Sequence, residues 1–205
     1  MSARKKALQK NNLWKLKQDF ILASGSPQRL RLLGCAGFHP TEIITADVDE
    51  TPLPKELPAR YVHRIAVKKA MAVAELKPNT CILGADTVIA VGKRIIRKAK
   101  TKEEAEQNLK LLSGRRSRVI TGFCVITPTG KQIAKVVQTT VEIKNMDSAD
   151  IQAVLDSGEW KNVAGYRIEG VLSACVRKII GSHPNIVGLP IFEVAQVLKG
   201  VLRQE

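Results

Sequence analysis

The run Cys81–Val91, CILGADTVIAV, limits the possible folds of this chain more than any other segment. Its length and its nearly unbroken apolar character predict a strand that is buried on both faces and interrupted where Gly84 and Asp86 lie. An ionised carboxylate in such surroundings is costly unless cations or hydrogen bonds compensate it. We therefore expect other segments of the chain to bring basic groups to Asp86.

The length and composition are typical of one globular folding unit. The 205 residues are 44% hydrophobic and 25% charged, and no apolar run has membrane-spanning length, so we expect no membrane partner. The basic N-terminus is not followed by an apolar stretch and a cleavage site, which predicts a cytoplasmic protein without a secretory signal. No cysteine pair has CxxC spacing, and the four cysteines are predicted to be reduced core residues: Cys35, Cys81, Cys124 and Cys175.

The formal net charge of +14 is compatible with three interpretations. It is expected of a nucleic-acid-binding module, of a basic tail combined with solvated faces, or of a basic cleft that attracts a compact anion such as a nucleotide. Aromatic residues make up only 4% of the chain, and no recognition motif for nucleic acid is present. Nucleic acid is therefore disfavoured as a partner.

A strand, a turn of small residues and a helix are predicted near the start of the chain. Asp19–Ser24 is a short apolar strand, Ser26 suits a helix N-cap, and Pro27 suits the first helical position. Such a junction directs unpaired backbone N–H groups at one spot, where an anion binds. The same residues also serve purely geometric purposes in turns. Arg29 favours the phosphate interpretation, because a basic side chain in the first helical turn is unfavourable to the helix dipole.

Two further segments supply charged groups. Asp47–Thr51, DVDET, follows a predicted strand at Ile43–Ala46 and carries three acids, which suit either a solvated turn or a hard divalent cation. The apolar period of Ala59–Leu76 predicts a helix with Val62, Ile65, Ala66, Val73 and Leu76 on one face. Lys69 falls on that face. It either lies at the edge of the apolar stripe or meets an anion in a cleft, and we favour the second because the helix leads directly into the Asp86 strand.

The remaining elements complete a mixed α/β pattern. We expect a capped helix at Thr101–Leu112, a hairpin of Ser117–Thr127 and Gln132–Lys144, a helix at Asp147–Ser157, strand pieces around Glu169, a strand at Ser173–Ile180, a loop at Gly181–Pro190 and a closing helix at Ile191–Leu202. The mixture of strands and helices with a long hairpin predicts a mixed sheet rather than a purely parallel one.

Several short motifs together resemble the Maf family of nucleotide pyrophosphatases. They are LASGSPQR at Leu22–Arg29, DVDET at Asp47–Thr51, KKA at Lys68–Ala70, GADTV at Gly84–Val88, LSGR at Leu112–Arg115, and AGY, EG and VGLP within Ala164–Pro190. Each motif is weak alone, but the ordered set is specific. The resemblance implies a basic N-terminal tail at 1–18 and a single Maf-like domain at 19–205. It also implies a mixed, elongated central sheet with flanking helices, two lobes around a cleft, and a homodimer.

The resemblance implies hydrolysis of a nucleoside triphosphate to the monophosphate and pyrophosphate, with Mg²⁺ or Mn²⁺ and a house-cleaning or division-linked role. By position, it gives Asp86 the role of general base and makes Glu50 a catalytic carboxylate that holds the metal with Asp86. The other implied roles are phosphate contacts by Lys69 and Lys98, a phosphate loop with Ser24, Ser26, Gln28 and Arg29, and substrate recognition by Thr87 and Glu169.

The chain departs from the family pattern at four positions. Gln28 stands where most members have a second arginine, and Lys98 lies in Arg97–Ala99 rather than in a GKP or EKP motif. Glu169 replaces the glutamine of the branch that acts on dTTP and UTP. Thr87 replaces the glutamine of the branch that acts on 7-methyl-GTP. The substrate is expected to be dTTP, UTP or a modified nucleotide, with 7-methyl-GTP hydrolysis or a non-catalytic nucleotide-binding division regulator as alternatives.

Overall fold

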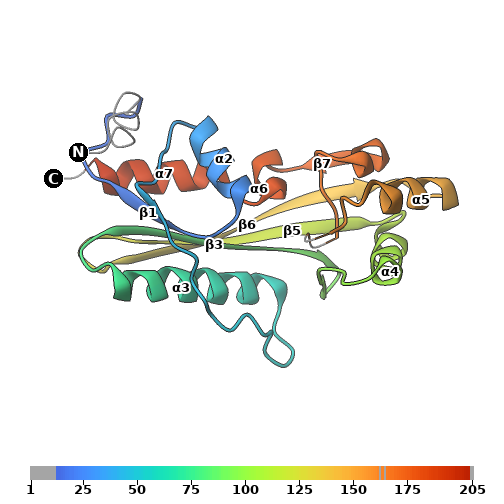
Figure 1. Ribbon diagram of the computed structural model, residues 1–205, viewed down its shortest axis with the longest axis horizontal. Helices are drawn as coiled ribbons and strands as arrows, with labels where there is room; N and C mark the ends of the chain where they lie inside the picture. The colour runs from blue at the N-terminus through green and yellow to red at the C-terminus, as the bar shows by residue number, and fades with distance from the viewer. Residues whose placement is uncertain (1–12, 162, 164, 204–205) are drawn as a thin grey trace. The chain divides into compact units, whose positions relative to one another are not determined.

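The computed structural model describes residues 13–161, 163 and 165–203 as an α/β protein (Figure 1). The elements, in chain order, are β1 (Phe20–Ala23), α2 (Pro27–Cys35), β2 (Glu42–Ile43), α3 (Pro58–Leu76), β3 (Cys81–Val91), β4 (Arg94–Ile96), α4 (Lys102–Leu112), β5 (Arg116–Ile126), β6 (Gln132–Ile143), α5 (Ser148–Ser157), η1 (Val171–Cys175), β7 (Val176–Ile180), α6 (His183–Val187) and α7 (Ile191–Leu202). None of the helices in these ranges is long and apolar enough to cross a membrane.

The seven strands form one mixed sheet in the order β2-β1-β3-β5-β6-β7, with β4 paired to β3. The pairing of β1 with β2 and with β3 is parallel, and Ala23 lies opposite Gly84. The pairs β3–β4 and β6–β7 are antiparallel. The predicted α/β class with a mixed central sheet and flanking helices is confirmed.

The chain divides into two compact units. Unit 1 contains the residues up to Asp86, Thr121–Val136 and the residues from Gly188 onward, and unit 2 contains Thr87–Ile120 and Val137–Val187. The chain therefore passes from one unit to the other within β3, β5 and β6, and again between Val187 and Gly188.

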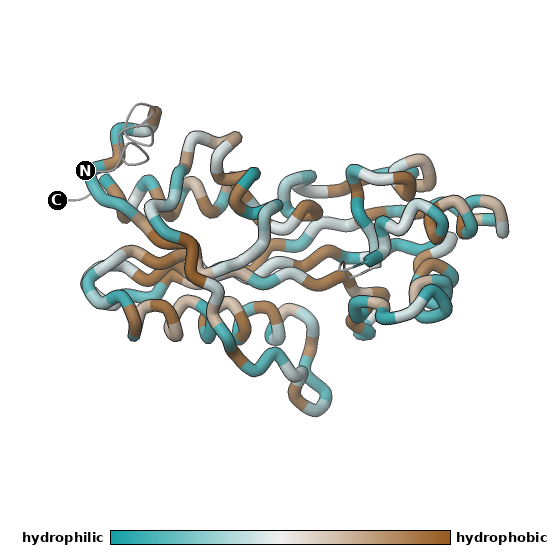
Figure 2. The backbone as a smooth tube through the Cα atoms, viewed as in Figure 1, coloured by the Kyte–Doolittle hydropathy of each residue, from teal (hydrophilic) through white to brown (hydrophobic). Residues whose placement is uncertain are grey.

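Unit 1 has its own apolar core between α3 and the strands. Its buried members are Ile21, Ala23, Ala66, Ala70, Val73, Ile82, Cys124 and Ile126. All four residues of β1 are buried, and Figure 2 shows this strand as strongly hydrophobic. In Figure 1, α3 lies on one side of the unit 1 strands, and α2 and α7 lie on the other. The sheet of unit 1 is therefore covered on both faces, which explains the unbroken apolar run of β3.

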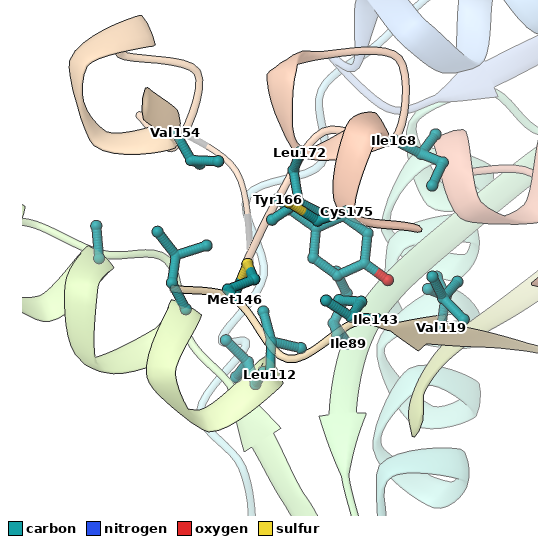
Figure 3. Close-up of a cluster of buried hydrophobic side chains, with 14 of the residues drawn as sticks. Ile89, Leu112, Val119, Ile143, Met146, Val154, Tyr166, Ile168, Leu172 and Cys175 are labelled. Atoms are coloured by element: carbon teal, nitrogen blue, oxygen red, sulfur yellow. The ribbon is translucent and has the colours of Figure 1, made fainter. Parts of the chain in front are cut away.

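Unit 2 has a second core, which surrounds Tyr166 (Figure 3). Leu112 from α4, Leu172 from η1 and Cys175 belong to this cluster. The Tyr166 hydroxyl lies 3.1 Å from Ser117 Oγ, so its polar end is satisfied inside the core.

The prediction that the strand at Cys81–Val91 is interrupted at Gly84 and Asp86 is wrong. The strand runs without a break through Gly84 and Asp86, because Gly84 keeps its place opposite Ala23 of β1. The expected strand at Ile43–Ala46 is shorter and earlier, since β2 ends at Ile43.

Other errors occur where local patterns compete with tertiary packing. Leu76 is 68% exposed rather than part of the buried face, because it is the last residue of α3 and the chain turns away at Lys77. Cys35, the last residue of α2, is exposed, whereas the other three cysteines are buried as predicted.

The segment around Glu169 forms turns instead of the expected strand pieces, since its glycines favour turns. The predicted strand at Ser173–Ile180 begins three residues later as β7, after the short helix η1. The predicted loop at Gly181–Pro190 contains the five-residue helix α6.

Residues 13–18, which precede the predicted domain, contact other parts of unit 1. The Trp14 ring stacks on Phe38 with 5.8 Å between centroids, and its indole N–H donates to the Ala36 carbonyl at 2.7 Å. The Lys17 N–H donates to the Leu202 carbonyl at 2.8 Å. Of the predicted basic tail at 1–18, the part at 1–12 lies outside the described residues.

Candidate functional site

The loop after β1 contains the predicted phosphate loop. Ser24 follows the last residue of β1, and Ser26 is the N-cap of α2 with an extended backbone. The Ser26 hydroxyl oxygen accepts the Arg29 backbone N–H at 3.5 Å, and the hydroxyl donates to Gln28 Oε1 at 3.2 Å. The predicted strand, turn and helix start are confirmed, with Pro27 as the first helical residue.

The Arg29 side chain is enclosed within unit 1 rather than extended into solvent. The residue is 9% exposed; its Nη1 donates to Ser24 Oγ and its Nε donates to the Gly188 carbonyl, both at 2.9 Å. Burial lowers the pKa of the Arg29 guanidinium, and the negative charges of Asp86 and Glu50 act in the opposite direction. Arg29 therefore joins the predicted phosphate loop to the segment before α7 and places a cation near the two carboxylates.

Asp86 has the compensating cation that its sequence context requires. It is 7% exposed, and its Oδ1 lies 2.8 Å from Lys69 Nζ. The same ammonium lies 2.7 Å from Glu50 Oε1, whose side chain is 51% exposed. One lysine on α3 therefore binds two carboxylates, one from a buried strand and one from an exposed loop. Lys69 thus lies against two carboxylates in the structure, and its contact with a phosphate stays a prediction.

Two glycines allow α3 to approach the sheet closely enough for this contact. A Cβ added to Gly84 would lie 2.7 Å from the Ala66 carbonyl oxygen and 2.8 Å from the Ala70 nitrogen. A Cβ added to Gly122 of β5 would lie 2.3 Å from the Val62 carbonyl oxygen. The absence of side chains on the strands therefore sets the depth at which α3 packs, and with it the position of Lys69.

Sequence reasoning missed this packing role of Gly84 and also missed Tyr61. The Tyr61 hydroxyl donates to the Glu50 backbone carbonyl at 2.9 Å. Burial, followed by the charges of Asp86 and Glu50, raises the pKa of Tyr61 to about 12, so the hydroxyl keeps its proton at neutral pH. The small residues Ala66 and Ala70, one helical turn apart, were the available signal for a close approach of α3.

The predicted site residues belong to both units. Those in unit 1 are Ser24, Ser26, Gln28, Arg29, Glu50, Lys69 and Asp86. The other three belong to unit 2: Thr87 is half-buried and follows Asp86 in β3, Lys98 is exposed two residues after β4, and Glu169 is exposed in a turn before η1.

The carboxylates of unit 1 suit a divalent cation that is shared with a ligand. Within the described ranges, no group of three or more His, Cys, Asp and Glu residues has the arrangement of a metal site. Glu50 and Asp86 nevertheless converge on one ammonium group at 2.7 and 2.8 Å. Mg²⁺ is commonly held by one or two carboxylates together with phosphate oxygens and water. The donor set fits an ion of that kind.

Comparison with known proteins decides the family. The model of the Maf-like protein family matches residues 19–201. The chain belongs to the Maf-like family. This match covers the whole of both units except for the N-terminal segment and the last residues, and it includes every predicted site residue.

Curated relatives carry a substrate in their names. A protein of Mesorhizobium japonicum named dTTP/UTP pyrophosphatase is 46% identical over 190 residues, which cover 89% of this chain and 91% of the relative. A protein of Paramagnetospirillum magneticum with the same name is 48% identical over 181 residues, covering 88% and 95%. A HAM1 protein structure from Coxiella burnetii has a TM-score of 0.51 at 15% identity, covering 89% and 99%, and shows similarity of fold alone.

Proposed function

We propose that this Maf-like protein hydrolyses nucleoside triphosphates to the monophosphate and pyrophosphate, with dTTP and UTP as substrates. The observation that carries the proposal is the Lys69 ammonium, which holds the carboxylates of Glu50 and Asp86 in the unit that also contains the phosphate loop. The names of the relatives support the choice of nucleotides.

In the proposed reaction, a water oxygen bonds to the α-phosphorus and the bond from that phosphorus to the bridging oxygen breaks. Pyrophosphate leaves with the electron pair, and Asp86 accepts the proton of the attacking water. Negative charge on the transferring group is stabilised by Lys69, by the backbone N–H groups at the start of α2 and by the charge of Arg29. Because Lys69 Nζ contacts both carboxylates, a triphosphate competes with them for this ammonium.

Glu50 and Asp86 are the residues that would hold Mg²⁺ or Mn²⁺. When bound, such an ion neutralises charge on the phosphate oxygens. Glu50 is the more adaptable ligand, since its side chain is half exposed, whereas Asp86 is fixed in β3. Removal of divalent ions with a chelator is therefore expected to abolish turnover.

Three residues of unit 2 complete the proposal. We assign Lys98 to a phosphate contact, and Thr87 and Glu169 to recognition of the nucleotide. Glu169 and Lys98 are exposed, which is compatible with contact to a ligand. Because Glu169 replaces a glutamine of the dTTP and UTP branch, 7-methyl-GTP is the second candidate substrate. A homodimer in the cytoplasm is the proposed form of the enzyme.

A nucleotide screen tests the proposal. The chain is incubated with dTTP, UTP, 7-methyl-GTP and the standard nucleotides, each with Mg²⁺ or Mn²⁺, and monophosphate and pyrophosphate are quantified. We expect equal amounts of the two products, fastest from dTTP or UTP, and at least about 100-fold slower release from Asp86→Asn. Faster release from 7-methyl-GTP would establish the alternative substrate. Saturable nucleotide binding without product would contradict the enzyme and establish a binding regulator.

A further inference from the structure

The position of Glu50 needs an explanation, because the residue lies on an exposed loop. Figure 1 shows the segment between β2 and α3 as a long excursion that returns to the start of α3. The Glu50 side chain is 51% exposed, yet its Oε1 lies 2.7 Å from Lys69 Nζ. A surface ion pair alone holds a side chain weakly, since each partner loses rotamer freedom and water screens the charges. Other contacts must fix this loop.

Two side chains of α3 bind the backbone at this position. The Tyr61 hydroxyl donates to the Glu50 carbonyl at 2.9 Å, and Arg64 Nη2 donates to the Thr51 carbonyl at 3.1 Å. Tyr61 is 7% exposed, so its ring is held by the core while its hydroxyl reaches the loop. Consecutive carbonyls are therefore anchored to one helix.

The Arg64 side chain is itself held by a residue of the loop, Glu56. Arg64 Nε and Nη2 contact the two oxygens of Glu56 at 2.7 and 2.6 Å, which is the paired geometry of a strong guanidinium–carboxylate contact. Glu56 Oε2 also accepts the Leu53 N–H at 3.0 Å. The Arg64 guanidinium lies 5.6 Å from the centre of the Tyr61 ring. Tyr61, Arg64 and Glu56 form a connected set of contacts, which we call the loop clamp.

The loop clamp and Lys69 share one rigid element. Tyr61 and Lys69 are eight residues apart on α3, which is about two helical turns. The helix therefore fixes one partner of the Lys69–Glu50 ion pair directly and the other through the clamp. Any displacement of the loop relative to α3 changes the distance from Glu50 to Lys69 and Asp86.

We propose that Tyr61 is a positioning residue of the active site, which holds Glu50 beside Asp86 by fixing its backbone through the loop clamp. This inference rests on the proposed function, in which Glu50 and Asp86 together hold a divalent ion. The Tyr61 hydroxyl contacts the backbone and not the carboxylate, so its removal leaves the ligand chemistry of Glu50 unchanged. Its loss frees the ligand to move.

The expected effect of Tyr61→Phe follows from that division of roles. Loss of a group that orients a metal ligand typically weakens metal affinity or activity about 10- to 100-fold. Since Arg64 still holds the neighbouring carbonyl, we expect the lower end: kcat/KM falls about tenfold, and the Mn²⁺ concentration for half-maximal activity rises about tenfold. The melting temperature is measured alongside, so that loss of folded protein is separated from loss of position.

A double-mutant cycle with Glu50→Gln tests the route of the effect. If Tyr61 acts through the Glu50 carboxylate, Tyr61→Phe changes kcat/KM by less than about twofold in the Glu50→Gln background. If Tyr61→Phe lowers kcat/KM by the same factor in the Glu50→Gln background as in wild type, the proposal is overturned. An unchanged Mn²⁺ requirement in Tyr61→Phe would also overturn it. Thr41→Val is the matched control, because the Thr41 hydroxyl also donates to a backbone carbonyl, that of Phe20 in β1, outside the clamp. We expect wild-type kinetics from it.

A binding measurement makes the test independent of turnover. Mn²⁺ is titrated by electron paramagnetic resonance into wild type, Tyr61→Phe and Thr41→Val, each saturated with an α,β-methylene analogue of dTTP that cannot release pyrophosphate. Weaker Mn²⁺ binding by Tyr61→Phe alone supports the clamp, and equal binding by all three overturns it. A wild-type chain that binds Mn²⁺ but releases no pyrophosphate from any nucleotide contradicts the proposed function, while the titration still decides the role of Tyr61.

Discussion

Replacement of Gly84 by alanine tests whether the depth of α3 controls both stability and the site. The added methyl carbon would lie 2.7 Å from the Ala66 carbonyl oxygen, 2.8 Å from the Ala70 nitrogen and 2.9 Å from Ala70 Cβ. Ordinary contact begins at 3.4 Å, so the closest approach is about 0.7 Å too short. All three atoms belong to α3, so the helix must retreat from β3 or the strand must shift.

The structure sets the size of the expected loss. Overpacking of this kind costs about 1–3 kcal/mol, and the better strand propensity of alanine offsets about 0.5–1 kcal/mol. We expect Gly84→Ala to lower the free energy of unfolding by about 1–2 kcal/mol. Lys69 lies between the two alanines that the methyl group displaces, and a misplacement of about 1 Å can cost about 100-fold in rate. We therefore expect kcat/KM to fall about tenfold or more.

The assay combines urea unfolding, followed by tryptophan fluorescence, with pyrophosphate release from dTTP. Gly200→Ala is the control, because Gly200 lies in α7 and the added carbon would have no atom within 4 Å apart from its chain neighbours and the backbone of its own helix. That substitution should raise stability by about 1 kcal/mol, since alanine favours a helix, and leave kcat/KM unchanged. A Gly84→Ala variant with wild-type stability and wild-type kcat/KM would refute the packing role of this glycine.

Three further outcomes are expected. Asp86→Asn should lower kcat about 100-fold or more in a folded protein, measured by pyrophosphate release, and a loss of only a few-fold would exclude a general base. Arg29→Lys should lower kcat/KM about tenfold, because an ammonium cannot reproduce the two directed contacts of the guanidinium, and wild-type kinetics would count against its bridging role. At pH 8 a thiol reagent should modify Cys35 rapidly, whereas burial, which raises the pKa of Cys81 to about 12, keeps that thiol protonated until urea is added. Rapid modification of Cys81 in native protein would contradict its burial.

The parts of the site that were predictable from the sequence depend on local chemistry. Ser26 and Pro27 specify a helix start by themselves, whatever the rest of the chain does. Asp86, an isolated acid in the apolar run of β3, indicated that a cation lies beside it, and the helical period of the apolar residues in α3 indicated Lys69 as that cation. These inferences depend only on residues that are close in the sequence or on the general free-energy cost of burying a charge.

The parts that were missed depend on which segments meet. Gly84 was interpreted as an interruption of the strand. Its role is to leave space for α3, and a hydrophobicity pattern does not show which element fills the space beside a glycine. The contact between Tyr61 and the Glu50 carbonyl has no sequence pattern, since a backbone acceptor is present at every residue. The hydrogen bond from Arg29 to the Gly188 carbonyl joins residues 159 positions apart, so it also could not be predicted without the folded structure.

The structure of unit 1 makes α3 the common reference for the candidate site. Its depth is set by Gly84 and Gly122, its middle carries Lys69, and its first turns hold the Glu50 loop through Tyr61. A substitution that displaces the whole helix moves the cation and the loop together, so it should lower stability and turnover at once. A substitution in the loop clamp releases only the loop, so it should raise the divalent-ion concentration needed for half-maximal activity while most of the folding free energy remains. The two classes of variant are therefore distinguishable by their ratio of stability loss to activity loss.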